Sequence, residues 1–191
     1  MRLFVALEIP AHVRNHLTAL IRELSKLETS SAHKRAGWVR PENLHVTLKF
    51  IGETPPDKLV SIRGELNAVR SDSSLELRFR GLGCFPNERR PRVLWAGMEA
   101  MPNLASLAGE IEERLEKLGI ERDPRSFTPH LTLARFDPPG ISQELRSKVR
   151  ENSTHDFGSL HTSEFHLIQS KLKPTGAEYT TLQSFRFAAE A

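Results

Sequence analysis

The sequence has almost no cysteine and no long apolar run, and each shortage excludes a class of protein. Cys84 is the single cysteine in 191 residues, so no internal disulfide can form and a disulfide-stapled fold is excluded. No stretch approaches the roughly 20 apolar residues of a membrane-spanning helix, and the first apolar run is too short for a signal peptide. We therefore expect a cytoplasmic protein without a membrane partner.

Motifs for nucleotide-driven and metal-dependent chemistry are also missing. The chain has no glycine-rich phosphate loop and no lysine motif of the nucleotidyl-transferring ligases, which argues against ATP-driven ligation as a main activity. His12 and His16 lie four residues apart in a predicted helix, but the metalloprotease glutamate and a clear third ligand are absent. We predict no metal and no other cofactor.

The composition that is present is typical of a globular enzyme or binding protein. Hydrophobic residues make up 38% of the chain and charged residues 27%, far from the signature of disorder. The formal net charge is +3 and the pI is about 9.2, which favours an anionic partner without identifying one. The length suits one compact unit, so we expect a single domain over residues 1–191, and we expect it to be a monomer.

Apolar periodicity predicts an α+β fold. Helical spacing is expected for residues 13–27, 54–69, 103–118 and 142–149. Strands are expected at residues 3–9, 44–51, 75–80, 92–98, 127–136, 164–172 and 179–187, with a polar loop at 29–37. We expect Phe50 and Phe136 to lie in the core, and Trp38 and Trp95 to be packing residues rather than base-stacking ones.

One short pattern occurs twice, inside two predicted strands. The two copies, at 45–48 and 130–133, read His45-Val46-Thr47-Leu48 and His130-Leu131-Thr132-Leu133. Residues i and i+2 of a strand point to the same face, so each imidazole stands beside its own threonine hydroxyl while the apolar residues enter the core. The repetition favours a functional pair over two structural histidines.

Two imidazoles with a pKa near 6.5 can divide acid and base work at neutral pH, one accepting a proton while the other donates one. Neighbouring threonine hydroxyls can hydrogen-bond phosphate oxygens. Neither motif holds an activated serine or cysteine nucleophile. The set therefore suits phosphodiester chemistry better than acyl transfer.

The two motifs resemble those of the two-histidine (2H) phosphoesterase superfamily, in particular the bacterial RNA 2′,3′-cyclic phosphodiesterases, also called 2′-5′ RNA ligases or LigT-like proteins. The likeness extends over nearly the whole chain, from the opening strand to the segment that ends at Tyr179. It implies a bilobal fold in which two pseudo-symmetric antiparallel sheets line a central cleft, with helices outside.

The same resemblance implies a reaction and a set of roles. A terminal 2′,3′-cyclic phosphate on RNA would be hydrolysed to a 2′-phosphomonoester without a metal, and 2′-5′ linkages would be joined or cleaved weakly. His45 would donate a proton to the leaving 3′ oxygen and His130 would accept one from water. Thr47 and Thr132 would hold the phosphate, with Arg135 beside them.

Strand alternation predicts opposite faces for two further cationic residues, Arg135 and Lys49. Arg135 is five positions after His130, so an unbroken strand would place it on the opposite face, and a bulge or strand end must turn it inward. Lys49, four positions after His45, is predicted on the cleft face from geometry alone, as a second phosphate contact, with a solvated lysine as the alternative.

Two other functions use the same residues. A binding module could capture RNA or 2′-5′ linked oligonucleotides in the cleft without turnover, although the intact second histidine argues against it. A ligase working in the opposite direction is indistinguishable by sequence, because microscopic reversibility lets one site serve both directions.

Overall fold

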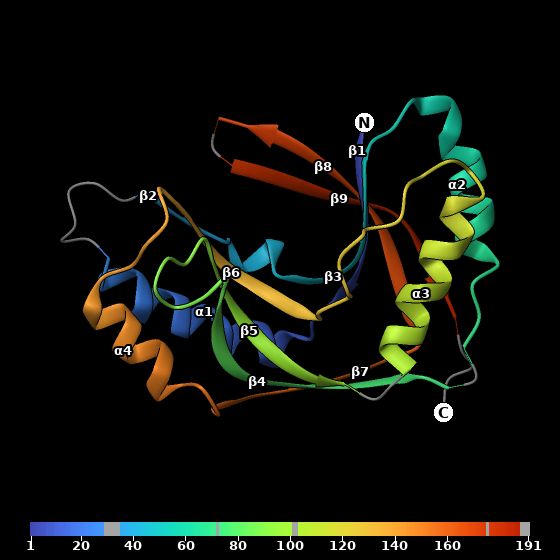
Figure 1. Ribbon diagram of the computed structural model, residues 1–191. Coiled ribbons are helices and arrows are strands. Elements are labelled where there is room, and N and C mark those ends of the chain that lie inside the picture. Colours follow the sequence, from blue (N-terminus) through green and yellow to red (C-terminus); the bar gives the residue numbers. More distant parts are fainter. Residues whose placement is uncertain (29–34, 72, 101–102, 175, 188–191) are drawn as a thin grey trace.

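A computed structural model describes residues 1–28, 35–71, 73–100, 103–174 and 176–187 of the chain, and its strands form two antiparallel sheets (Figure 1). The four-stranded sheet has the order β3-β1-β8-β9, with bounds β1 (Arg2–Glu8), β3 (His45–Glu53), β8 (Glu164–Lys173) and β9 (Gly176–Arg186). The five-stranded sheet has the order β2-β6-β5-β4-β7, with bounds β2 (Arg35–Trp38), β4 (Leu75–Phe85), β5 (Val93–Ala100), β6 (His130–Asp137) and β7 (Asp156–Thr162).

Four α-helices and two short 3-10 helices connect the strands in the described parts of the chain. The α-helices are α1 (Ala11–Lys26), α2 (Leu59–Asn67), α3 (Asn103–Glu116) and α4 (Gln143–Glu151), and the 3-10 helices are η1 (Pro41–Asn43) and η2 (Pro56–Lys58). None of these helices has the length and apolar character needed to cross a membrane. The predicted α+β class, with two antiparallel sheets, is confirmed.

Each sheet has its own pair of helices (Figure 1). Helix α1 contacts both edge strands of the five-stranded sheet, β2 and β7, so this sheet curls around it, and α4 packs against β4. Helices α2 and α3 pack against β9 and β3 of the four-stranded sheet, and against one another. The buried stripe of α3, which includes Leu107, Ile111 and Leu115, has the spacing that the sequence indicated.

Two strands differ from the sequence expectation. β2 begins at Arg35, within the region predicted as loop, and the rest of that predicted loop lies largely outside the described residues. β7 was not predicted, because only Phe157 and Leu160 of its residues are buried and the others are polar or small. Both strands are sheet edges, where half of the backbone groups need no partner strand and the apolar pattern is weak.

Candidate active site

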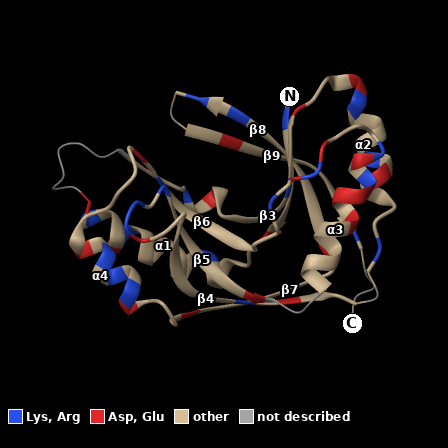
Figure 2. Ribbon diagram, in the orientation of Figure 1, with Lys and Arg blue, Asp and Glu red and all other residues tan. Residues whose placement is uncertain are grey.

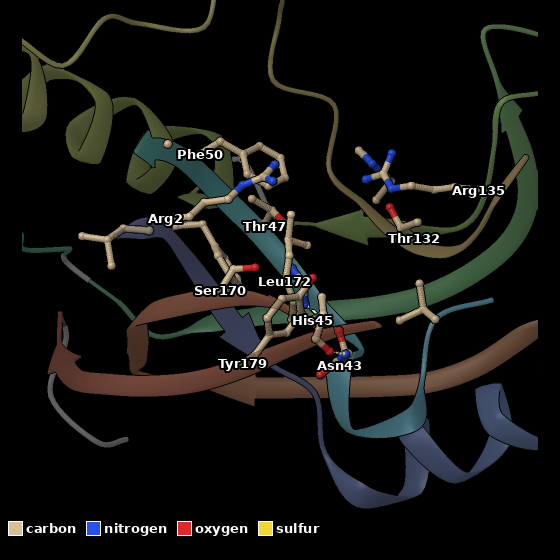
Figure 3. Close-up of a pocket in the computed structure, with 16 residues that line it drawn as sticks. Arg2, Asn43, His45, Thr47, Phe50, Thr132, Arg135, Ser170, Leu172 and Tyr179 are labelled. Carbon is tan, nitrogen blue, oxygen red and sulfur yellow. Dashed lines mark hydrogen bonds between the residues drawn. The ribbon is translucent and has the colours of Figure 1, made fainter. Parts of the chain in front are cut away.

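The two histidine motifs come together in one cavity of about 580 Å³ between the sheets (Figure 3). β3 is an edge of the four-stranded sheet, and β6 is the strand of the other sheet that lies against it. From these two strands His45, Thr47, His130, Thr132 and Arg135 all line the cavity. Five of the six residues singled out in the sequence therefore share one site, and Lys49 does not.

Matching β-bulges in the two strands explain both results. In β3, Ala6 of β1 faces Thr47 and Val5 faces Lys49, so Leu48 has no partner on β1. In β6, Trp95 of β5 faces Thr132 and Leu94 faces Ala134, so Leu133 is likewise extra. A bulge reverses which face the following residues occupy. The second bulge turns Arg135 into the cavity, as the sequence required of it.

The first bulge corrects two predictions. Lys49 turns away from the cavity and is only 3% exposed, so it cannot contact a phosphate there. Its ammonium group donates to Glu112 Oε2 on α3 (2.5 Å) and to the carbonyl oxygen of Glu121 (2.6 Å). Phe50 moves the other way, from the predicted core into the cavity, where it is 56% exposed. Phe50 and Arg135 thus occupy equivalent positions in the two motifs.

The two imidazoles are oriented in the same way. His45 Nδ1 lies 2.7 Å from the carbonyl oxygen of Asn43, and His130 Nδ1 lies 2.8 Å from that of Thr128. A carbonyl oxygen only accepts, so each Nδ1 carries a proton, and in the neutral ring the lone pair is on Nε2. Each ring therefore has its Nε2 available for proton transfer.

Neighbouring rings restrict both histidines. His45 packs against Phe4 (centroids 4.8 Å apart) and edge-on against Tyr179 (5.3 Å). His130 meets Phe85 edge-on at 5.0 Å. The Asn43 amide also donates to the carbonyl oxygen of Ala177 (2.8 Å), which joins the segment preceding His45 to the β8–β9 hairpin.

Trp95 and Trp38 behave as the packing residues that the sequence suggested. The Trp95 ring lies against Gly83 so closely that a Cβ at that glycine would come within 2.2 Å of it. Phe85 covers Trp95 with ring centroids 5.1 Å apart. Trp38 packs edge-on against Phe136, which is buried as predicted. Phe85 thus links the Trp95 ring to His130, which it also contacts.

Burial and nearby cations shift the pKa values of two neighbouring cavity residues, His45 and Tyr179. Burial is the main cause that lowers the pKa of His45, partly offset by its hydrogen bond to Asn43, while the charges of Arg135 and His130 lower it further. Burial raises the pKa of Tyr179, against the opposing fields of Arg135 and Arg2. The cavity is thus a positive environment, ready for an anionic ligand.

Several cavity residues were not singled out in the sequence. Arg2, Ser170, Leu172 and Tyr179 line it from β1, β8 and β9. These strands belong to the same sheet as β3, but β1 and the first half of β8 are buried on both faces, so alternation there does not show which side chains face the cavity.

A metal-binding cluster is not found in the described parts of the chain, where no three His, Cys, Asp or Glu side chains are grouped suitably. His16, one of the two histidines considered from the sequence, has its Nδ1 3.2 Å from the carbonyl oxygen of Phe157. That contact gives this ring a structural role in joining α1 to β7.

Comparison with known proteins places this site in a family. The chain is 37% identical over 185 residues to an RNA 2′,3′-cyclic phosphodiesterase of Archaeoglobus fulgidus, covering 97% of this chain and 99% of that protein. A protein of the same name from Methanothermobacter thermautotrophicus is 33% identical, with 97% and 98% covered. The crystal structure of TT0787 of Thermus thermophilus superimposes with a TM-score of 0.77 at 32% identity, covering 98% of both chains.

The family model described as LigT like phosphoesterase matches residues 7–95 and 98–179. Those two segments contain both histidine motifs and most of the cavity wall. The extent of the match agrees with the resemblance inferred from the motifs. The chain belongs to the LigT-like phosphoesterase family.

Proposed function

We propose that the protein hydrolyses 2′,3′-cyclic phosphate ends of RNA to 2′-phosphomonoesters by acid–base catalysis with two histidines and no metal. The observation that carries the proposal is the paired imidazole geometry, in which each Nδ1 is bound to a backbone carbonyl oxygen and both rings line one cavity with two threonine hydroxyls and Arg135. The curated relatives at 33% and 37% identity carry the same activity in their names.

The reaction follows from the positions of these groups. Water attacks the cyclic phosphorus and gives its proton to His130 Nε2, while the bond from phosphorus to the 3′ oxygen breaks and His45 Nε2 protonates that oxygen. The phosphate then remains on the 2′ oxygen. The assignment of His45 as donor and His130 as acceptor follows the family resemblance, and both rings offer the same Nε2 atom for the transfer.

The remaining cavity residues are suited to holding the RNA end. Thr47 and Thr132 stand beside their histidines and can donate hydrogen bonds to phosphate oxygens, and the guanidinium of Arg135 can offset the charge that develops on them. Phe50 presents an exposed ring to the same cavity. Aromatic faces stack on unpaired RNA bases, so we assign Phe50 to the terminal base.

Ligation is part of the proposal only as the same displacement with a different attacking group. If a 5′-hydroxyl of RNA replaces water as the attacking group, the same proton transfers give a 2′-5′ linkage. RNA as the partner, the monomeric state and the cytoplasmic location stay predictions.

The test is incubation of the purified protein, in chelator, with an RNA oligonucleotide that ends in a 2′,3′-cyclic phosphate. The wild type should produce a 2′-phosphate end, and His45→Ala or His130→Ala should lower the rate by about 10² to 10⁴. His161→Ala is the matched control, because that histidine is exposed on β7 and bonds to Ser74. Retention of the oligonucleotide without turnover by the wild type would instead identify a binding module.

A further inference from the structure

The cavity continues past the catalytic pair, along β1 and β8, into a region that the proposed reaction does not use (Figure 3). Arg2 and Ser170 face one another across these two strands and both line the cavity. Leu172, 73% exposed, lines the same end. This end therefore presents a cation, a hydroxyl group and an apolar surface.

Arg2 has the character of a ligand-binding cation rather than of a structural one. It is exposed, and within the described residues its guanidinium group makes no ion pair or hydrogen bond. The carboxylate of Glu53, its cross-strand neighbour on β3, lies instead 3.5 Å from the Met1 amino group. By contrast, the exposed Arg78 and Arg125 are each paired with an aspartate.

The strand register fixes the order of the groups along the cavity. Thr47 is opposite Ala6, Phe50 is opposite Phe4, and Arg2 is two residues further along β1. At about 3.3 Å per residue, the Cα of Arg2 lies about 7 Å along β1 from that of Phe4, the partner of Phe50, and about 13 Å from that of Ala6, the partner of Thr47. Along β1 the order is therefore the level of the Thr47 hydroxyl, that of the Phe50 ring and then Arg2, the second cation.

The electrostatics agree with two separate cationic ends. The fields of both Arg135 and Arg2 reach the phenol of Tyr179 and oppose the rise that burial causes in its pKa. Tyr179 is in register with Ser170 and Arg2, and its ring reaches back to His45, with centroids 5.3 Å apart. Figure 2 shows basic residues at the outer end of β8, where Lys171 and Lys173 flank Leu172 and Lys173 is paired with Glu178.

A ligand that matches this order has one phosphate at each end of a nucleoside. We propose that Arg2 and Ser170 form a second subsite, which binds the internucleotide phosphodiester on the 5′ side of the terminal nucleotide. Leu172 then contacts the next nucleoside. The inference rests on the proposed function and narrows it: the substrate class is the end of an oligonucleotide rather than a free cyclic mononucleotide.

The test compares two substrates, a trinucleotide and a mononucleotide that both end in a 2′,3′-cyclic phosphate. In Arg2→Gln, the ratio of kcat/KM for the trinucleotide to kcat/KM for the mononucleotide should fall about tenfold or more, because a hydrogen bond to a charged group is lost. The slope of log(kcat/KM) against log salt for the trinucleotide should become shallower by about 0.7. Arg22→Gln removes an exposed arginine on α1 and should leave the ratio as in the wild type.

Other outcomes would overturn the subsite. Equal losses of kcat/KM with both substrates would mean that Arg2 acts on the terminal nucleotide, for example by supporting Phe50. An unchanged kcat/KM with both substrates would mean that Arg2 is a solvated side chain that contacts neither. If the wild type hydrolyses neither substrate, the proposed function fails, and the subsite is judged by retention of the trinucleotide. Arg2→Gln must then weaken retention more than Arg22→Gln does.

Discussion

The buried ion pair between Lys49 and Glu112 gives the sharpest prediction about stability. The Lys49 side chain is 2% exposed and that of Glu112 is 18% exposed, and in the described part of the chain the ammonium group bonds to Glu112 and to the carbonyl oxygen of Glu121 alone. Glu112→Leu would leave this charge buried without its counter-ion. Breaking a buried pair in this way costs about 3–5 kcal/mol.

For a chain of this length, that cost corresponds to a fall in Tm of roughly 6–20 °C, at about 2–4 °C per kcal/mol. Replacing both partners, as in Lys49→Met with Glu112→Leu, removes the desolvated charges together and should restore most of the stability. The assay is thermal and urea unfolding of wild type, both single variants and the double variant. A double-mutant cycle then gives the coupling energy.

The matched control is Glu113→Leu, one position along α3, where the carboxylate is exposed. Its effect should stay within about 0.5 kcal/mol. A loss of less than about 1 kcal/mol for Glu112→Leu would refute the reasoning, because it would show that water reaches the Lys49 ammonium group. A double variant no more stable than Glu112→Leu would refute it as well.

Three more predictions concern the cavity. Because burial and the charges of Arg135 and His130 lower the pKa of His45, Arg135→Ala should raise that pKa in an NMR titration, and an unmoved pKa would remove Arg135 from the field at His45. The folded chain binds this proton more weakly than the unfolded one, so the free energy of unfolding should fall as the pH drops below about 6.5. This fall should be smaller in His45→Gln, which has no imidazole to protonate at this position. Phe50→Ala should raise KM for the RNA end by about 5- to 150-fold, since stacking on an aromatic ring contributes about 1–3 kcal/mol per base, whereas an unchanged KM would show that the base binds elsewhere.

The two bulges show where sequence reasoning succeeded and where it stopped. A bulge was required for Arg135 because the resemblance placed it in the site while simple alternation did not. In that motif two apolar residues, Leu133 and Ala134, follow one another, which is itself a sign of a change of face. In the first motif the equivalent second residue is Lys49, and its charge hid the same buried pair of positions.

Pairings between distant strands were also beyond the sequence. Arg2 and Ser170 are neighbours only because β1 pairs with β8, and nothing in the alternation of these two strands marks their cavity face. The edge strands β2 and β7 carry too little apolar pattern to be seen. Their positions depend on backbone hydrogen bonds, which any residue other than proline can make.

The sequence by itself determined the α+β class and the two strands in which His45 stands beside Thr47 and His130 beside Thr132, because strand alternation is a local property of the chain. Only the tertiary structure decided that the two strands face one cavity, that Phe50 enters it while Lys49 pairs with Glu112, and that Arg2 lies at its far end. The physical reason is that register, bulges and sheet-to-sheet contact depend on pairing between segments far apart in the chain, and each single-residue shift exchanges the two faces of a strand.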